Sequence, residues 1–188
     1  MKQEILPAIR LTIVSLILVS VLYPLLIWGF AQIIGPAQGK VELVYHNGKA
    51  VGAALVGQSF SEDRYFWGRP SAVDYNGGGS GGSNKGPSNP DYLALVQSRI
   101  DSFLVHNSGV AKKDIPAELV TASGSGLDPD ISPAAAKIQV ARISAARGIP
   151  AQQLEQLIEQ HTQQALLGLF GPKKVNVLTL NLALDQIK

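Results

Sequence analysis

The sequence contains no cysteine. Disulfides, zinc–thiolate sites and cysteine nucleophiles are therefore excluded for this chain. Histidine is also scarce: the three histidines, His46, His106 and His161, lie far apart in the sequence. Histidine-based metal sites usually bring their ligands together at short, regular spacings. The sequence therefore predicts no metal site.

A large excess of charge of either sign is missing as well. The 16 Lys and Arg residues nearly balance the 14 Asp and Glu residues, the net charge is +2, and no long basic block occurs. Domains that bind nucleic acid present a clustered positive surface, so we expect no nucleic-acid partner. Charged residues make up only 16% of the chain, against roughly 25% in an average soluble domain. The apolar surplus is concentrated near the N-terminus.

Charge is absent altogether from Leu11 to Ile34. This run of roughly 24 residues is long enough to cross a hydrocarbon core of about 30 Å as a helix. A cleaved signal peptide would have a shorter apolar core of about 7–15 residues, and a buried helix of a soluble domain is rarely so long. We therefore predict a retained transmembrane helix over residues 11–34, in contact with membrane lipid. Pro24 and Gly29 are tolerated if neighbouring groups satisfy the freed backbone.

Positive charges flank this run unevenly. Lys2 and Arg10 precede it closely, whereas Lys40 and Lys49 follow it at a greater distance. Basic residues next to a membrane span tend to remain in the cytoplasm. The sequence therefore predicts a cytoplasmic N-terminus over residues 1–10. The domain over residues 35–188 is then expected outside the cytoplasmic membrane.

Two segments alternate apolar and polar residues in the manner of strands. The segment VELVYHNGKAVGAALVGQ alternates around Asn47-Gly48, and Asn-Gly in that setting is the strongest short signal of a β-hairpin. We predict strands over residues 41–46 and 49–56. The segment VNVLTLNLAL near the C-terminus alternates as well, which predicts a further strand with one apolar face.

Three helices are predicted between these strands, over residues 90 to about 106–109, 133–147 and 150–167. Asn89 is the expected N-cap of the first helix, and Gly148 the stop signal of the second. The inward face of the third is predicted to comprise Leu154, Leu157, Ile158, Ala165 and Leu166. The order ββ-α-α-α-β predicts an α+β domain with a small mixed, largely antiparallel sheet packed with helices.

The segment TASGSGLDPDISPAAAKIQ, residues 121–139, concentrates glycine, hydroxyl and carboxylate groups. Asp128 and Asp130 raise the question of acid–base catalysis or cation binding. No third carboxylate follows at the spacing of a calcium-binding loop, and no matching His or Lys constellation can be read nearby. We therefore predict a structured turn in which Asp130 and Ser132 satisfy N–H groups at the start of the next helix. Ligand binding, and hydrolysis by Ser125 or the Asp pair, stay open as alternatives.

The second predicted helix carries three basic residues, Lys137, Arg142 and Arg147. Steps of five residues rotate by about 140° around a helix, so these side chains do not form one stripe. A solvated face is the simplest expectation for them.

Several motifs in order resemble one known family. They are GQSF (57–60), YFWGRPS (65–71), GGSNKGPSNP (81–90), ELVTASGSGLDPDISPAAA (118–136) and VNVLTLNLALD (175–185). The chain resembles the KdpC family, the C subunits of the bacterial ATP-driven potassium uptake system. One departure is Lys85, where the family usually has an apolar or small residue, and it bears on the packing of that loop.

The resemblance implies a non-catalytic, single-span subunit of the bacterial inner membrane. Such a subunit assembles with a channel-like potassium-translocating subunit, a P-type ATPase subunit and a small single-span subunit, and covers the side from which potassium enters. ATP and K+ are then handled by the partner subunits. The sequence itself contains neither the D-K-T-G run of a phosphorylated aspartate nor a filter-like T-V-G-Y-G run.

The family is also described as a catalytic chaperone that raises ATP affinity, with the Gln of its S-P-x-A-A-x-x-Q run implicated. In this chain that residue is Gln139. The predicted topology conflicts with this role, because ATP is cytoplasmic, and an ordinary surface glutamine is the other interpretation. Tyr65, Arg69 and Asp128 are predicted as polar contacts to partner subunits. An equally good interpretation is that these three residues hold their own loops together.

Overall fold

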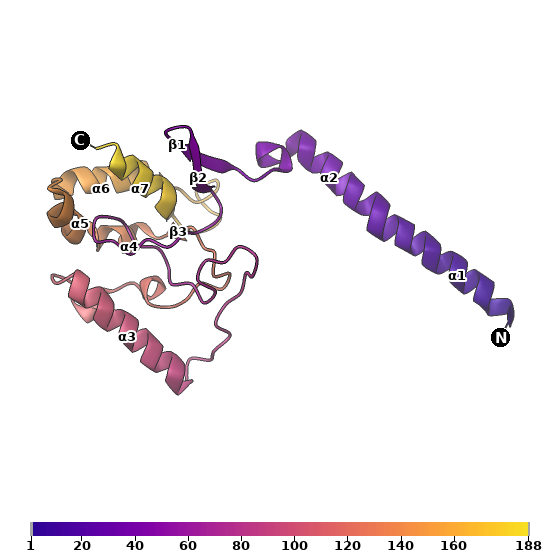
Figure 1. Ribbon diagram of the computed structural model, residues 1–188, viewed down its shortest axis with the longest axis horizontal. Helices are drawn as coiled ribbons and strands as arrows, with labels where there is room; N and C mark the ends of the chain where they lie inside the picture. Colours follow the sequence, from indigo (N-terminus) through magenta and orange to yellow (C-terminus); the bar gives the residue numbers. More distant parts are fainter. Residues whose placement is uncertain (1, 188) are drawn as a thin grey trace. The chain divides into compact units, whose positions relative to one another are not determined.

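The computed structural model describes residues 2–187, which form two compact units divided after Glu42 (Figure 1). The first unit is a long apolar helix. It consists of α1 (Lys2–Ile17), a π-helical turn (Leu18–Leu22) and α2 (Tyr23–Ile34), with a 3-10 turn over Pro36–Gly39. The π turn directly precedes Pro24, whose ring and missing N–H a wider turn accommodates.

The stretch Glu4–Ile34 is long and apolar enough to cross a membrane. An 18-residue window within it reaches a mean hydropathy of 2.4, and none of that window is buried inside the structure. A helix that is apolar on all sides and covered by no protein is suited to a lipid environment.

The second unit, here called the α+β domain, begins with the predicted hairpin. β1 (Leu43–His46) pairs antiparallel with β2 (Lys49–Ala53). Asn47 and Gly48 have φ values of 50° and 76°, as a type I′ turn requires. The second strand is shorter than predicted, because the chain turns where the N–H of Val56 donates to the carbonyl of Ala53.

α3 (Pro90–His106) has the predicted bounds. The Asn89 side chain accepts a hydrogen bond from the Tyr92 N–H at 3.0 Å, which satisfies a free donor of the first turn. Two 3-10 turns, Lys112–Asp114 and Ala117–Leu119, lead from α3 towards the next strand.

The helix predicted over residues 133–147 is broken into α4 (Pro133–Lys137) and α5 (Val140–Arg147). Gln139 lies at the break. Its side-chain amide donates to the Ala135 carbonyl, which a continuous helix would pair with the Gln139 N–H, and that N–H donates to Ala136 instead. The predicted stop is confirmed, because Gly148 has a φ of 68°.

The third predicted helix is shorter than expected. α6 covers Ala151–Gln160, and the chain continues into β4 (Thr162–Gln163) rather than extending the helix to residue 167. Leu154 and Ile158 are buried as predicted, but Leu166 is exposed. The helix ends where Thr162 turns its hydroxyl back to the Ile158 carbonyl and its backbone pairs with a neighbouring strand.

The strand predicted for VNVLTLNLAL is wrong beyond its first residues. β5 covers Lys174–Asn176, and α7 follows over Val177–Asp185. Asn176 caps α7 by accepting from the Thr179 N–H at 3.0 Å. The buried residues Val177, Leu180, Asn181 and Leu184 have the i, i+3, i+4, i+7 spacing of one helix face.

β5 lies between β3 (Asp130–Ile131) and β4, and both pairings are antiparallel. The predicted α+β class is therefore confirmed, with two small antiparallel sheets instead of one. Helices α4 to α7 pack together next to the three-stranded sheet (Figure 1). The largest fully buried side chains at their centre include Phe66, Ile131, Ile143, Leu154, Ile158, Leu180 and Leu184.

Candidate functional site

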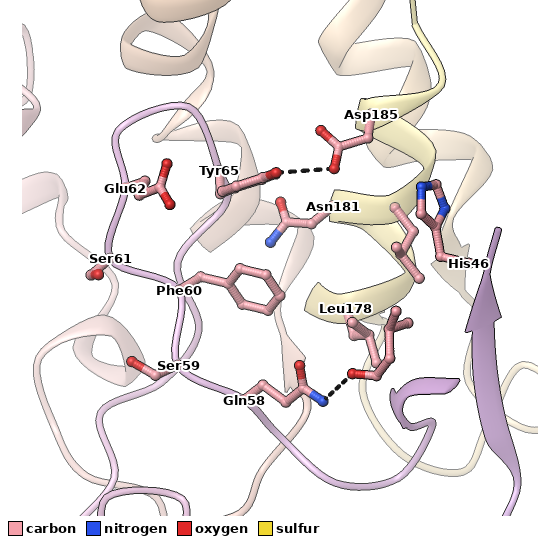
Figure 2. Close-up of a pocket in the computed structure, with 12 residues that line it drawn as sticks. His46, Gln58, Ser59, Phe60, Ser61, Glu62, Tyr65, Leu178, Asn181 and Asp185 are labelled. Carbon is pink, nitrogen blue, oxygen red and sulfur yellow. Dashed lines mark hydrogen bonds between the residues drawn. The ribbon is translucent and has the colours of Figure 1, made fainter. Parts of the chain in front are cut away.

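A cavity of about 420 Å³ opens between the hairpin, the segment Gln58–Tyr65 and α7 (Figure 2). Its wall is mixed. Aromatic and aliphatic side chains lie beside hydroxyl, amide and carboxylate groups. The lining residues are His46, Val51, Gln58, Ser59, Phe60, Ser61, Glu62, Tyr65, Leu178, Asn181, Leu182 and Asp185.

Both carboxylates in this wall have partners. The Tyr65 hydroxyl donates to Asp185 Oδ2 at 3.0 Å, and Asp185 also binds Arg147. Glu62 accepts from Arg64 at 2.7 Å. Partial burial, and then the hydrogen bond to Asp185, raise the pKa of Tyr65. Glu62 and Asp185 are thus each held by a neighbouring side chain, and His46 is the remaining titratable group of the wall.

In the wall of the cavity, the side-chain amide of Asn181 pairs with the backbone of a buried extended segment. The Phe66 N–H donates to Asn181 Oδ1 at 2.8 Å, and Asn181 Nδ2 donates to the Phe66 carbonyl at 2.9 Å. Asn181 thus satisfies both backbone groups of one residue, as a neighbouring strand would in a sheet. Both residues are buried.

The next residue is paired in the same way from another helix. The Trp67 N–H donates to Gln139 Oε1 at 2.8 Å, and Gln139 Nε2 donates to the Trp67 carbonyl at 3.1 Å. Backbone groups of successive extended residues point in opposite directions. Asn181 of α7 and Gln139 at the α4–α5 break therefore hold Phe66-Trp67 from two sides. We call this arrangement the amide clamp.

Arg142 extends the amide clamp into the core. Its guanidinium donates to Gln139 Oε1 at 2.6 Å, to Asn107 Oδ1 at 3.1 Å and to the Asp63 carbonyl at 2.7 Å. It lies over the Trp67 ring at 4.2 Å. Burial lowers its pKa to about 10, against the opposing effect of Asp63. The expected solvated face is wrong for Arg142, which is buried because these acceptors replace its water shell.

A second set of contacts closes the segment 121–139 against the YFWGRPS motif. Arg69 donates to Asp128 Oδ2 at 2.9 Å, and the Ser71 hydroxyl donates to the Gly126 carbonyl at 2.7 Å. The Gly57 N–H donates to Leu127 at 2.8 Å. A Cβ at Gly57 would collide with the carbonyl of Asp128, so glycine is required at this close approach.

The turn predicted in this segment is present, but only one of the two predicted capping residues caps the next helix. Ser132 caps α4 by accepting from the Ala135 N–H at 3.1 Å. Asp130 does not cap the helix. It lies in β3, and its Oδ2 accepts from Lys174 Nζ at 2.6 Å. Asp128 makes a local turn by accepting from the Asp130 N–H at 3.1 Å. Ser125 accepts from the Leu127 N–H at 3.1 Å within the loop, whereas Asp128 and Asp130 bind Arg69 and Lys174 outside it.

The predicted site residues thus lie in two neighbouring contact systems. Gln139 belongs to the amide clamp and is fully buried, so the expectation of a surface glutamine is wrong. Arg69 and Asp128 bind each other, and Tyr65 binds Asp185, so these contacts link segments that lie 59 and 120 residues apart in the chain. Their contact with partner subunits stays a prediction. Asn181 was not predicted as a site residue, although an asparagine within the apolar run LNLAL is a usable signal of a buried polar role.

Tyr75 provides a pH-dependent probe of this region. Its hydroxyl donates to the Arg69 carbonyl, and burial, with a smaller effect of the Asp128 charge, raises its pKa. A raised folded-state pKa gives stability that is complete below the unfolded pKa of about 10 and is lost as pH rises through the folded value. Urea unfolding should therefore show a lower free energy of unfolding at pH about 11 than at pH about 8.

The Tyr75→Phe variant isolates this effect, because it removes the ionising group and keeps the ring. The variant is expected to lose less stability than the wild type between the two pH values. The comparison is needed because the lowered pKa of Arg142 acts in the opposite direction above pH 10. An equal loss in both proteins would show that Tyr75 does not carry the pH dependence.

Together these features define a class of protein in which one helix suited to a membrane precedes an α+β domain. Buried polar side chains hold distant segments of that domain together. Among residues 2–187, no group of three or more His, Asp and Glu side chains is arranged to hold a metal ion.

Comparisons with known proteins agree with this class. Residues 5–186 match the model of the family described as KdpC: K+-transporting ATPase, c chain. The chain is 52% identical over 188 residues to the potassium-transporting ATPase KdpC subunit of Bacteroides fragilis strain YCH46, covering 99% of this chain and 98% of the relative. It is 54% identical over 180 residues to the same-named subunit of Flavobacterium johnsoniae, covering 96% of each chain. The same-named subunit of Caldanaerobacter subterraneus is 44% identical over 189 residues, covering 100% of this chain and 98% of the relative. The chain belongs to the KdpC family.

Proposed function

We propose that this chain is a non-catalytic accessory subunit of an ATP-driven potassium uptake complex. It would assemble and stabilise the channel-like potassium-translocating subunit and the P-type ATPase subunit, next to a small single-span subunit. Its α+β domain would cover the side from which potassium enters. ATP and K+ would be bound by the partner subunits.

One observation carries this proposal. The family match extends over residues 5–186 and so includes the apolar helix as well as the whole α+β domain. The relatives, which are matched along almost their full length, are named as subunits of a potassium-transporting ATPase. The matched region therefore contains both a helix suited to a membrane and a folded α+β domain.

The use of the polar side chains supports the non-catalytic part. Catalytic groups must keep an unpaired donor, acceptor or nucleophile directed at a substrate. Here Gln139, Arg142 and Asn181 direct their polar atoms at one another or at the backbone. The Arg69 guanidinium binds Asp128 through Nη1 and the Lys174 ammonium binds Asp130, while Arg69 Nε is buried without a hydrogen-bond partner in the part of the chain that the structure describes.

The alternative function is a chaperone that binds nucleotide through Gln139 and raises the ATP affinity of the ATPase subunit. Gln139 is 0% exposed, and its amide already contacts Trp67, Ala135 and Arg142. A nucleotide could reach this amide only after the Phe66–Trp67 segment had left it. The positive residues before the apolar helix also favour an outer domain, away from cytoplasmic ATP.

One labelling experiment tests the proposal against this alternative. Because the chain lacks cysteine, Ser108→Cys introduces a unique thiol at an exposed loop position of the α+β domain. Intact cells that contain all subunits are treated with a membrane-impermeant thiol reagent, and the tagged chain is then purified in mild detergent. We expect labelling before lysis and copurification with the channel-like and ATPase subunits.

Two outcomes would contradict the proposal. Labelling only after lysis would place the domain in the cytoplasm and favour the nucleotide-binding role. Purification of the chain without the larger subunits would contradict the accessory role itself. A chain without the introduced thiol is the control for background labelling.

A further inference from the structure

The connection between β4 and β5 exposes four large apolar side chains within five consecutive residues. We call residues Ala165–Gly171 the apolar loop. Leu166, Leu167, Leu169 and Phe170 are 64–81% exposed to solvent. Single exposed apolar residues are ordinary on soluble surfaces, but a contiguous group at a protruding turn marks an interaction site. The side chains of this loop are therefore candidates for contact with another molecule.

The apolar loop is a defined turn with its own hydrogen bonds. Leu166 and Phe170 form an antiparallel bridge, with both N–H···O distances at 2.9 Å, and the Gly168 N–H donates to Ala165 at 2.8 Å. Leu167 has a φ of 55°, a left-handed conformation that is unfavourable for a leucine. Hydrogen bonds thus hold the backbone in a form that directs leucine and phenylalanine side chains outwards.

The surface beside the apolar loop is charged and has both signs. Pro172, Lys173 and Lys174 continue the chain from the loop and line a hollow of about 240 Å³ together with Glu118, Asp128, Asp130 and Arg69. The pairs Lys174–Asp130 and Arg69–Asp128 lie in its wall. An apolar centre bordered by polar and charged groups is the usual anatomy of a protein–protein interface.

We propose that the apolar loop inserts into an apolar hollow on another protein subunit of the complex, with Lys173 facing an acidic residue at the edge of that hollow. This inference rests on the proposed accessory function and names the surface that carries it. A bilayer surface fits less well, because the hollow beside the loop is lined by as many acidic as basic side chains and two of its carboxylates are paired with Arg69 and Lys174. Such a surface offers no net positive charge to anionic headgroups, whereas a protein partner can match both signs of charge.

The direct test compares two variants of the full chain, expressed with its partner subunits. The first combines Leu167→Ser, Leu169→Ser and Phe170→Ser in the apolar loop. The control is Leu93→Ser, which removes a leucine that is 52% exposed on α3. We expect the loop variant to associate with the larger subunits at least 10-fold more weakly than wild type, as loss of an apolar anchor does at other interfaces. The control should retain wild-type association.

Thermal unfolding of each purified chain separates a lost contact from a lost fold. The loop side chains are exposed, so the loop variant should unfold within a few degrees of wild type. Unchanged association of a folded loop variant would overturn the assignment of this surface and leave the accessory function intact. If the wild-type chain itself fails to copurify with the larger subunits, the accessory function fails first.

A fluorescent probe distinguishes a protein partner from lipid. The Leu169→Cys chain is labelled with an environment-sensitive dye, with Leu93→Cys as the matched control, and each is reconstituted into vesicles that contain lipids with a nitroxide quencher. We expect the dye at position 169 to remain in a polar environment in the chain alone, and to move to an apolar one only when the partner subunits are present. Quenching by lipid in the chain alone would overturn the proposal in favour of membrane insertion.

Discussion

Gln139→Met is expected to lower the free energy of unfolding of the α+β domain by about 3–5 kcal/mol. Methionine fills a similar volume but offers no amide. The N–H and carbonyl of Trp67 then lose their partner, and Arg142 loses one acceptor inside the core. Each unsatisfied buried group costs about 1–3 kcal/mol, and more when the group is charged. Part of this cost is recovered if the segment relaxes towards water.

The measurement is urea unfolding of the full chain in detergent, followed by tryptophan fluorescence. The chain has two tryptophans, and a Trp28→Phe background leaves Trp67 as the only reporter at the amide clamp. Gln153→Met is the matched control, because Gln153 is exposed on α6 and should change stability by less than about 0.5 kcal/mol. Equal stability of Gln139→Met and wild type would show that the amide clamp is not a source of stability.

The expected loss of stability in Gln139→Met can itself cause a loss of function, without any ligand at this residue. If the residue acts through the amide clamp, loss of ATPase stimulation in Gln139→Met should follow the fraction of unfolded domain. Lower temperature, or an independent stabilising condition, should then restore activity. A nucleotide ligand at Gln139 would instead leave the ATP affinity low in a fully folded variant.

Asn181→Leu is expected to destabilise the α+β domain by about 2–4 kcal/mol. Leucine has nearly the shape of asparagine, so the main change is that the Phe66 N–H and carbonyl lose both hydrogen bonds while remaining buried. Gln186→Leu, on an exposed position next to the end of α7, is the control and should be nearly neutral.

The two halves of the amide clamp should also be coupled. Asn181 and Gln139 hold adjacent residues of one segment, so releasing either side lets the segment move away from the other. The double variant Gln139→Met/Asn181→Leu should therefore be less destabilised than the sum of the single variants, by about 1 kcal/mol or more. Additive effects in the double-mutant cycle would mean that the two amides act independently.

Local signals predicted much of the fold. The Asn47-Gly48 turn, the Asn89 and Ser132 caps and the Gly148 stop each depend on one residue and its immediate neighbours, and the structure has all four. Such features are set by backbone geometry and capping chemistry, which sequence shows directly.

The errors occurred where long-range contacts decide the local structure. The leucines of VNVLTLNLAL alternate, but Val177, Leu180, Asn181 and Leu184 of the same run fit one helix face. The pairing of Asn181 with buried Phe66 accompanies the helical arrangement. Residues 133–147 have the composition of a single helix, and the pairing of Gln139 with Trp67 accompanies its break. Gln139 was named by family resemblance, whereas Tyr65, Arg69 and Asp128 were named as exposed-type residues in Gly- and Pro-rich settings. Their partners lie 59 to 120 residues away in the chain, a distance that periodicity does not encode.

The amide clamp also sets the order in which the chain can finish folding. Phe66 lies 115 residues before Asn181, and α7 ends at Asp185, close to the C-terminus. Hydrogen bonds across such a separation form only when both segments are available, and a chain is synthesised from its N-terminus. A nascent or truncated chain that lacks α7 therefore holds Phe66 with unpaired backbone groups. Synthesis of α7 is therefore required before the Asn181 half of the amide clamp can form, whatever structure the preceding segments have already reached.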